Sequence, residues 1–256
     1  MRAVLVFGGT STVGFEIVQI CARLGYSVVF TYHSAYEKAL NDLSLLNEEF
    51  PDLFFYAHYF DALDNNQREN CIQKIFQNYD NISTVIYNTS LFFYDNIQNH
   101  KTEDMIKSMD IHVQCPLLIL KTFKEHVSQN KIKNPSVIHM IDSRVVNLTP
   151  HFCTYTLGKA SLWALTQTAA REFIPDIRIN AVGLGPMTQG KNQTVEQFDQ
   201  QIASLPLNIK PSFEDLFKSI DCLLHCKSLT GQMLCLDSGM SLGWQFPDQK
   251  NPRFLS

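Results

Sequence analysis

The sequence predicts a single α/β domain built on a doubly wound parallel sheet. Short apolar runs alternate with longer amphipathic stretches, which is the order of a sheet whose strands are joined by helices. The apolar runs are nearly continuous in Val, Ile and Leu, as expected of strands that are buried on both faces. The chain has 256 residues, of which 45% are hydrophobic, and no linker divides residues 1–256. This length and composition suit one large core.

The elements follow one another along the chain. We expect seven strands, at residues 3–7, 27–32, 53–59, 83–88, 135–141, 177–183 and 232–237. Apolar residues at helical spacing predict helices that include residues 15–25, 111–127, 155–172 and 214–226. The stretch 186–212 breaks the alternation because it is polar and carries three prolines. We expect it to be a mobile excursion over the strand ends, where it forms a substrate loop.

Composition and charge argue against nucleic acid and membranes as partners. The net charge is −4, and the basic residues are scattered rather than gathered in a patch. The first apolar run, AVLVF, has only five residues, which is too short for a secretory leader or a membrane span. The seven cysteines form an odd set without CxxC spacing. We therefore expect reduced thiols, a cytoplasmic protein and no metal site.

A glycine-rich turn follows the first strand, in the segment "FGGTSTVGFEI". Gly8, Gly9 and Gly14 stand between a strand and a helix, where backbone N–H groups and the helix dipole can hold a phosphate. Glycines are common at such turns, so the motif alone is weak evidence. Its place in the first strand–helix unit of a parallel sheet favours a dinucleotide site.

The end of the second strand indicates which dinucleotide is bound. An acidic residue there would accept hydrogen bonds from the ribose 2′-hydroxyl and repel a 2′-phosphate. The segment "FTYHSAYEK" has no acid before Glu37 and offers Thr31, His33, Ser34 and Lys38 as donors. We therefore expect NADPH to be preferred over NADH.

The sharpest chemical signal is the pair Tyr155 and Lys159, which lie four residues apart and share one face of the expected helix. A free phenol is a poor acid–base catalyst at neutral pH, and an adjacent ammonium group would lower its pKa. Asp142 and Ser143 stand just upstream, and either is a candidate partner for the tyrosine. Neighbouring residues at a strand end point to opposite faces, so only one of them can face Tyr155.

The order and spacing of these pieces resemble the short-chain dehydrogenase/reductase family over nearly the whole chain, and the resemblance implies its Rossmann fold. The matching segments are FGGTSTVG, Asp61 after the third strand, YNTS, YTLGK, GLGP and LTGQMLCLDSG. Within the family, the chain is most similar to pteridine reductases and dihydromonapterin reductases. Most members carry a serine thirteen residues before the tyrosine, whereas pteridine reductases carry an aspartate, and here Asp142 occupies that position. "DIHVQCPLLIL" resembles the dihydromonapterin reductases, with His112 replacing the usual asparagine.

The resemblance implies both a cofactor site and a substrate site. Phe92, in "NTSLFF", falls where an aromatic ring packs over a pterin, so the implied substrate-binding residues are Phe92, Asp142 and Tyr155. The implied catalytic residues are Tyr155, Lys159 and Asp142, with Ser143 as the alternative to Asp142. The implied cofactor-binding residues are Gly8, Thr10, Ser11, Thr12, Val13, Gly14, Thr31, Tyr32, His33, Ser34, Asp61, Ala62, Asn88, Ser90, Tyr155, Lys159, Gly185 and Met187.

Three positions depart from the pattern of the resembled enzymes. Thr12 stands where pteridine reductases have an arginine that helps to bind cofactor phosphate and substrate. Thr89 replaces the usual alanine, and Leu184 replaces the proline of the usual turn. None of these changes removes a catalytic group.

The function that we expect is NADPH-dependent reduction of a reduced pterin. A ketone reductase needs a neutral hydroxyl beside the carbonyl oxygen, whereas a carboxylate at Asp142 suits a substrate with N–H donors, or a proton relay. Two alternatives remain at this point. One is a carbonyl or 3-oxoacyl reductase that uses Ser143, and the other is a nucleotide-sensing regulatory protein with little turnover.

The resemblance also implies a homotetramer. The segments "PLLILKTF" and "SLWALTQTAA" carry apolar side chains on more than one helical face, which favours a partner besides the sheet. The tail "GWQFPDQKNPRFLS", with Trp244, Phe246 and Phe254, is expected to pack on a neighbouring subunit.

Overall fold

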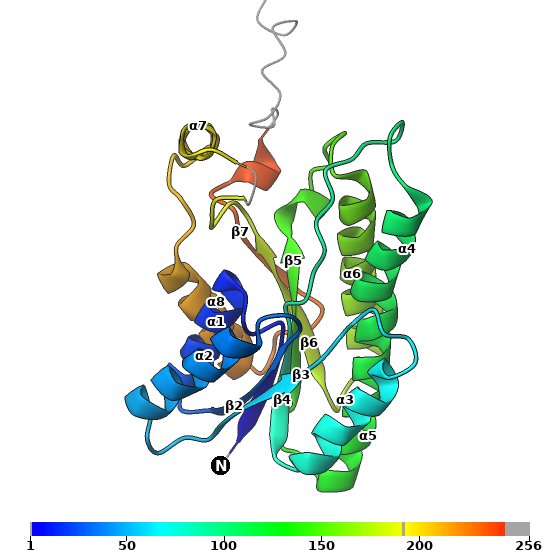
Figure 1. Ribbon diagram of the computed structural model, residues 1–256, viewed down its shortest axis with the longest axis vertical. Helices are drawn as coiled ribbons and strands as arrows, with labels where there is room; N and C mark the ends of the chain where they lie inside the picture. Colours follow the sequence, from blue (N-terminus) through cyan, green and yellow to red (C-terminus); the bar gives the residue numbers. More distant parts are fainter. Residues whose placement is uncertain (1, 191–192, 244–256) are drawn as a thin grey trace, which may run out of the picture.

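The computed structural model of the chain describes residues 2–190 and 193–243 (Figure 1). Its centre is a parallel sheet of seven strands in the order β3-β2-β1-β4-β5-β6-β7. The predicted doubly wound sheet is confirmed. The strands are β1 Ala3–Phe7, β2 Ser27–Tyr32, β3 Phe55–Tyr59, β4 Ile82–Tyr87, β5 Ser136–Asp142, β6 Arg178–Leu184 and β7 Met233–Leu236.

Helices cover both faces of this sheet (Figure 1). One face carries α1 Thr12–Arg23, α2 Tyr36–Glu49 and α8 Phe213–His225. The other face carries α3 Arg68–Asn78, α4 Thr102–Met109, α5 Cys115–Asn130 and α6 Cys153–Glu172. The remaining elements are α7 Val195–Ala203, the π-helix η1 Asp110–Gln114, and the 3-10 turns η2 Ser143–Val145 and η3 Met240–Leu242.

Two apolar clusters form the core, one between the sheet and each helical layer. Strand residues alternate between them: Leu5 and Phe7 belong to the cluster under α3, α5 and α6, while Val4 and Val6 belong to the cluster under α1, α2 and α8. Each of these four side chains is fully buried. This explains the continuous apolar runs in the sequence, because both faces of a central strand are covered.

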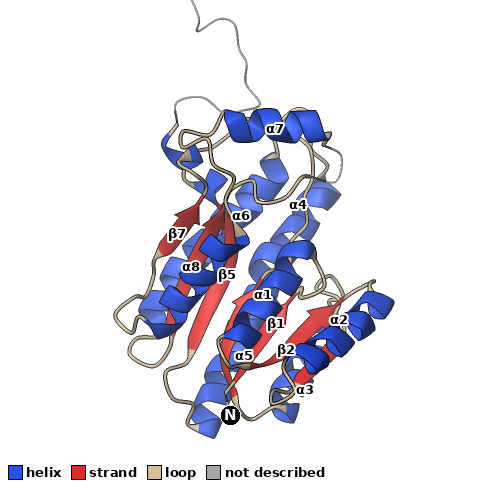
Figure 2. Ribbon diagram, turned by 90° about the vertical axis from the view of Figure 1, so that its left-hand side faces the viewer, coloured by secondary structure: helices blue, strands red, loops and turns tan. Residues whose placement is uncertain are grey.

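The structure differs from the expected elements in two places. Helical periodicity predicted one helix from residue 111, but α4, η1 and α5 form a continuous helical run from Thr102 to Asn130 with a π-turn at Asp110–Gln114. The expected loop 186–212 contains α7, whose first turn is closed by a capping box between Thr194 and Gln197. Figure 2 shows α7 lying across the end of the sheet to which the strand arrows point.

Strand order reverses between β1 and β4, because the chain first adds β2 and β3 on one side of β1 and then crosses to the other. In open parallel sheets, ligands bind beside such a reversal at the carboxyl ends of the strands. The glycine turn follows β1 and Asn88 follows β4, so both lie at this edge. Among the described residues, no helix is long and apolar enough to cross a membrane.

Candidate active site

The turn after β1 is built so closely that three of its positions admit only glycine. Gly8 has a φ of +78°, which side chains rarely adopt. A Cβ on Gly14 would lie 2.0 Å from the carbonyl oxygen of Gly8, and one on Gly9 would lie 2.7 Å from Cβ of Phe30. α1 begins at Thr12, and the first N–H groups of a helix have no partner within it. Ser11 Oγ caps the N–H of Gly14 at 3.0 Å, so those of Thr12 and Val13 are the candidates for a phosphate. This open, helix-started cradle fits a dinucleotide pyrophosphate.

Two side chains from neighbouring strands brace the glycine turn. The hydroxyl of Thr31 accepts a hydrogen bond from the Gly8 N–H at 3.0 Å, and Thr31 is only 1% exposed. The Asn88 amide donates to the Gly8 carbonyl and to Ser11 Oγ, both at 3.2 Å. Thr31 thus holds the glycine turn from within the protein, and its predicted contact with the cofactor stays a prediction.

The end of β2 presents His33 and Ser34, both of which are exposed. His33 Nε2 lies 3.5 Å from Asp61 Oδ2, so the side chains after β2 and β3 meet at this edge. Lys38, the other basic candidate, is instead paired with Asp42 at 2.7 Å and lies over the Phe15 ring. Both basic side chains thus lie near an acid, but the His33 contact is the longer one and its side chain is the more exposed, at 62% against 46% for Lys38. His33 is therefore the better placed of the two to reach a 2′-phosphate.

Aromatic rings gather at the end of β2, beside His33. Tyr32 lies 5.9 Å from Tyr36 and 6.1 Å from Tyr59 between ring centroids, and His33 lies 6.0 Å from Tyr59. Tyr36 and Tyr59 are each more than half exposed. The predicted adenosine end of the site is thus rich in flat surfaces suited to a base.

Tyr155 and Asp142 meet at the carboxyl end of β5. The Tyr155 hydroxyl donates to Asp142 Oδ2 at 3.0 Å, so the side chains thirteen residues apart are hydrogen-bonded as expected. Ser143 is completely buried, and its hydroxyl has no hydrogen-bond partner among the described residues, so it makes no hydrogen bond to Tyr155. β5 ends at Asp142 and η2 begins at Ser143, so the two neighbouring residues belong to different elements.

Arg144 is the second contact of the Asp142 carboxylate. Its backbone N–H donates to Asp142 Oδ1 at 2.9 Å, and its Nε lies 3.9 Å from the same oxygen. The guanidinium group lies 4.5 Å from the centre of the Phe152 ring. Asp142 therefore caps the turn and contacts Arg144 through Oδ1 while Oδ2 accepts from Tyr155, so its role is not confined to the turn.

The environment of Tyr155 keeps its phenol protonated. Burial raises the pKa of Tyr155 well above its usual range, and the negative charge and hydrogen bond of Asp142 raise it further, while Arg144 opposes this. The expectation that Lys159 lowers this pKa is not met. The Lys159 ammonium donates to the Met140 carbonyl at 2.8 Å and lies 5.9 Å from the centre of the tyrosine ring.

Lys159 is itself strongly affected by the site. Burial lowers its pKa from 10.5 to about 8, against the opposing charge of Asp142. The side chain is only 3% exposed, so the site holds a desolvated ammonium beside a carboxylate and a neutral phenol. Such a combination of perturbed groups is typical of catalytic sites.

Phe92 stands over the tyrosine. Its ring is 56% exposed, so it is not an ordinary core phenylalanine. The ring centroid lies 4.7 Å from that of Tyr155 and 4.6 Å from that of Phe152. Phe152, which we did not predict, has a φ of 60°, and its N–H donates to the Asp95 carbonyl at 2.7 Å. The left-handed backbone of this bulky residue, just before the helix that carries Tyr155, could not be predicted from the sequence, because such a conformation is rare for phenylalanine.

The remaining predicted cofactor residues fall into two groups. Thr10, Ser11, Thr12 and Val13 form the rim of the glycine turn and are exposed or half-buried. Ala62 and Met187 are about 5% exposed, and a Cβ on Gly185 would lie 2.6 Å from Cα of Asp237, so these three pack against the protein. The tail residues Trp244, Phe246 and Phe254 lie outside the described residues.

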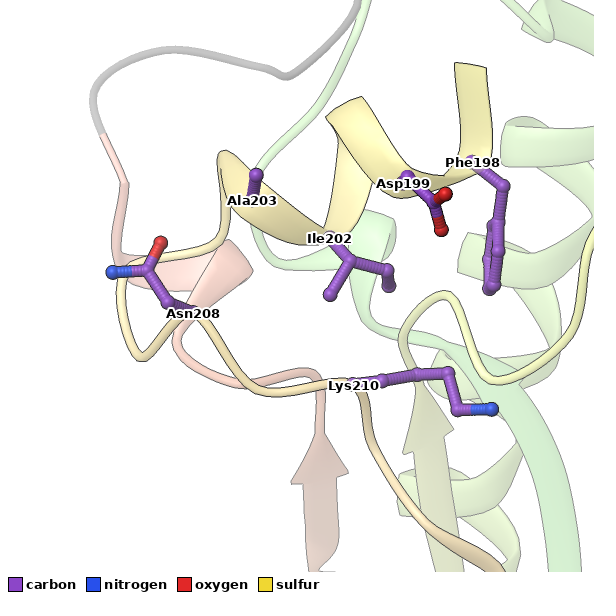
Figure 3. A pocket seen from close by; sticks show the side chains of 6 residues that line it. All are labelled: Phe198, Asp199, Ile202, Ala203, Asn208 and Lys210. Carbon is purple, nitrogen blue, oxygen red and sulfur yellow. The ribbon is translucent and has the colours of Figure 1, made fainter. Parts of the chain in front are cut away.

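A separate hollow of about 540 Å³ lies under α7, and its walls include none of the residues around Tyr155. Figure 3 shows Phe198 and Ile202 hanging from α7 on the side of Lys210. Its lining residues are Phe198, Asp199, Ile202, Ala203, Asn208 and Lys210. The hollow therefore belongs to the predicted substrate loop rather than to the catalytic centre.

Comparison with known proteins identifies the family. A family described as enoyl-(acyl carrier protein) reductase matches residues 8–241. The chain belongs to this branch of the short-chain dehydrogenase/reductases. Its curated relatives include dihydromonapterin reductases from Escherichia coli, 21% identical over 77% of this chain and 89% of the relative, and from Enterobacter, 20% identical over 94% and 97%.

Solved structures of this family resemble the chain closely. The alternative dihydrofolate reductase 1 (FolM) of Brucella canis, solved in complex with NADP, has a TM-score of 0.89 and 26% identity over 96% of both chains. The Brucella suis protein of the same name, also in complex with NADP, has a TM-score of 0.87 and 27% identity, covering 96% of this chain and 98% of its own. A short-chain dehydrogenase/reductase from Serratia marcescens, 20% identical with a TM-score of 0.84, shares the fold.

Proposed function

We propose that this short-chain dehydrogenase/reductase is an NADPH-dependent reductase of a reduced pterin, of the dihydropterin, dihydromonapterin or dihydrofolate type. The observation that carries the proposal is the hydrogen bond from Tyr155 to Asp142, while the Ser143 hydroxyl is buried and makes no hydrogen bond to the tyrosine. A carboxylate at this place accepts hydrogen bonds from ring N–H and amino groups, which pterins present and simple ketones lack. The dihydromonapterin reductase and dihydrofolate reductase names of the relatives support the same substrate class.

The cofactor site supports NADPH. The glycine turn from Gly8 to Gly14 would hold the pyrophosphate, and His33 with Ser34 would face the 2′-phosphate. Lys159 uses one of its three N–H donors on Met140, which leaves the others for the nicotinamide ribose. When bound, NADPH supplies the hydride. The neighbouring Brucella structures contain NADP.

The protein contributes the proton. Tyr155 is held neutral by burial and by Asp142, so it retains its proton for donation at neutral pH. Because its hydroxyl points to Asp142, proton delivery to a substrate nitrogen requires the hydroxyl to turn, or the carboxylate to pass the proton on. Phe92 would cover a flat heteroaromatic ring over Tyr155, since its own ring is exposed and in contact with the tyrosine.

A substrate comparison tests this proposal. NADPH oxidation would be followed with a dihydropterin, a ketone, a 3-oxoacyl thioester and an enoyl thioester under the same conditions. We expect the highest kcat/KM with the dihydropterin. A higher value with the ketone or either thioester would overturn the pterin assignment.

Two alternatives are decided by the same comparison. The carbonyl or 3-oxoacyl reductase that uses Ser143 is disfavoured because that hydroxyl is buried and makes no hydrogen bond to Tyr155. A nucleotide-sensing protein would bind NADPH without oxidising it on any substrate. Burying Tyr155 and Lys159 beside a carboxylate costs free energy of folding, and a protein that only senses a nucleotide has no need of this arrangement.

A further inference from the structure

A second polar cluster lies behind the catalytic tyrosine, around His112. The His112 side chain is completely buried in the π-turn between α4 and α5. Its Nε2 lies 3.0 Å from Ser90 Oγ, and its Nδ1 lies 3.2 Å from Ser108 Oγ. A Cβ on Gly158 would come within 2.5 Å of both Ser108 Oγ and His112 Nδ1, so a glycine in the YTLGK segment makes room for the cluster. The imidazole also stands edge-on to the Tyr155 ring at 5.9 Å.

The direction of each hydrogen bond in this cluster follows from one fixed contact. Ser108 Oγ lies 2.8 Å from the Thr154 carbonyl oxygen, which can only accept, so the single hydroxyl proton of Ser108 is used there. Ser108 must therefore accept from His112, which places a proton on Nδ1. In a neutral imidazole the other nitrogen is then an acceptor, so Ser90 donates its proton to Nε2.

The imidazole is neutral at physiological pH. Burial lowers the pKa of His112 to about 2, and the nearby charge of Lys159 lowers it as well, while a hydrogen bond to the Ser108 backbone opposes them. Both ring nitrogens would be donors in an imidazolium, which would leave Ser90 free to turn its proton outwards. Because the imidazole is neutral, its Nε2 accepts the Ser90 proton and keeps it turned inwards.

Ser90 occupies the middle of the proposed ligand site. It is exposed, and it lies two residues after Asn88, which braces the glycine turn, and two before Phe92, which contacts Tyr155. Ser90 thus contacts the buried His112 on one side, and on the other it is exposed where the cofactor and the substrate are proposed to bind.

We propose that His112 is a positioning residue that holds the Ser90 hydroxyl proton inwards, so that Ser90 offers only lone pairs to the bound ligand. The site then selects a hydrogen-bond donor at this point, either a hydroxyl of the cofactor or an N–H group of the substrate. The substrate half of this inference rests on the proposed pterin reduction, whereas the proton arrangement does not.

The proton arrangement can be observed without any ligand. In ¹⁵N-labelled protein, long-range ¹H–¹⁵N correlations distinguish the two neutral tautomers and the imidazolium. We expect His112 to be the Nδ1–H tautomer from pH 5 to pH 9. An Nε2–H tautomer, or an imidazolium in this range, would overturn the proposal whatever the substrate proves to be.

The effect on ligands is tested with Ser90→Ala, Ser108→Ala and the double variant. Ser108→Ala removes the hydroxyl that accepts from Nδ1 and leaves only the Ser108 backbone contact, so the Nε2–H tautomer becomes more populated and the Ser90 proton turns outwards more often. The variant should therefore weaken donor binding, by up to about tenfold, and change the tautomer signal. In a Ser90→Ala background the same substitution should have no further effect on binding, because the group that it acts through is gone. An equal effect in both backgrounds would mean that Ser108 and His112 act only through structure, and would overturn the proposal.

Two readouts identify the donor. A higher Kd for NADPH in Ser90→Ala assigns it to the cofactor, and a higher KM for dihydropterin at unchanged Kd assigns it to the substrate. Either result supports the proposal, and unchanged values of both overturn it. Should Ser108→Ala not fold, the wild-type tautomer and Ser90→Ala decide the matter. The Kd and the tautomer remain valid even if the pterin assignment fails.

Discussion

At the scale of single residues, the site is organised around one carboxylate. Asp142 Oδ2 accepts from Tyr155 and Oδ1 accepts from the backbone of Arg144, so both oxygens are fixed. The same carboxylate raises the pKa values of both Tyr155 and Lys159 relative to what each would have without it. Its charge therefore keeps the phenol neutral and helps the buried ammonium to stay protonated.

Tyr155→Phe should lower kcat by ~10²–10⁴-fold, the usual contribution of a general acid. The ring and its contacts with Phe92 would remain, so the Kd for NADPH, measured by fluorescence quenching, should stay close to the wild-type value. Retention of more than about a tenth of the activity would contradict the assignment of Tyr155 as the proton donor.

We expect activity to fall at high pH when Lys159 loses its proton. Because its pKa is lowered to about 8, the ammonium is lost above that pH, and kcat/KM for NADPH, which reports the free enzyme, should fall there. The unfolded chain still binds this proton up to about 10.5, so the same group makes the free energy of unfolding rise with pH between about 8 and 10.5. In Lys159→Arg the basic limb should disappear, since a guanidinium does not titrate in this range. A flat wild-type profile up to pH 10 would refute this.

His33 should carry the preference for NADPH. It is exposed at the end of β2, and the other basic candidate there, Lys38, is engaged with Asp42. His33→Ala should weaken NADPH more than NADH, so that the ratio of the two Kd values falls towards one. The matched control is Lys38→Ala, which should leave that ratio unchanged. A larger change of this Kd ratio in Lys38→Ala than in His33→Ala would contradict the prediction and assign the 2′-phosphate to Lys38.

At the scale of elements, the turn between β1 and α1 depends on Gly14. A Cβ there would lie 2.0 Å from the Gly8 oxygen, a backbone atom that cannot move aside cheaply. Gly14→Ala should raise the Kd for NADPH more than about tenfold, or ~1.4 kcal/mol. Gly25→Ala is a suitable control, because its φ of +83° also strains a side chain, by ~1–2 kcal/mol, but it lies at the far end of α1 with open space around it. Equal Kd values in the two variants would contradict the cofactor assignment.

Helices α6 and α7 should differ sharply in local stability. Nine residues of α6 are buried, including Tyr155 and Lys159, whereas α7 buries none and has a capping box at its first turn. Elements with few buried contacts open with a low free energy. Backbone amides of α7 should therefore exchange with deuterium much faster than those of α6. Comparable protection would show that α7 is held by contacts beyond those described.

At the scale of the whole molecule, the exposed apolar residues of the α4–α6 layer favour self-association. Ile106, Leu117 and Leu157 are each between 43% and 57% exposed. We expect a homotetramer by light scattering at micromolar concentration, and Leu117→Glu should shift it towards smaller species because a buried charge without a partner is costly. A monomeric wild-type protein would refute the expectation.

The sequence predicts the sheet well because strand burial is a local pattern. Each predicted strand overlaps the observed one, and the spacing of Tyr155 and Asp142 places them in contact. What the sequence misses depends on distant contacts: the left-handed Phe152 is held by the Asp95 carbonyl, and the pairing of Lys38 with Asp42 removes a donor. The pKa of Tyr155 was misjudged because helical spacing gives the distance to Lys159 but not the depth of burial.

The most direct test of the account compares Asp142→Ala with Ser143→Ala, using one dihydropterin and NADPH. Removing Asp142 takes away the hydrogen-bond partner of Tyr155, so kcat/KM should fall by at least ~10²-fold if it acts in proton transfer. Removing the Ser143 hydroxyl, which is buried without a partner among the described residues, should leave kcat/KM and stability nearly unchanged. A larger loss in Ser143→Ala than in Asp142→Ala would contradict both the Asp142–Tyr155 pair and the choice of a pterin.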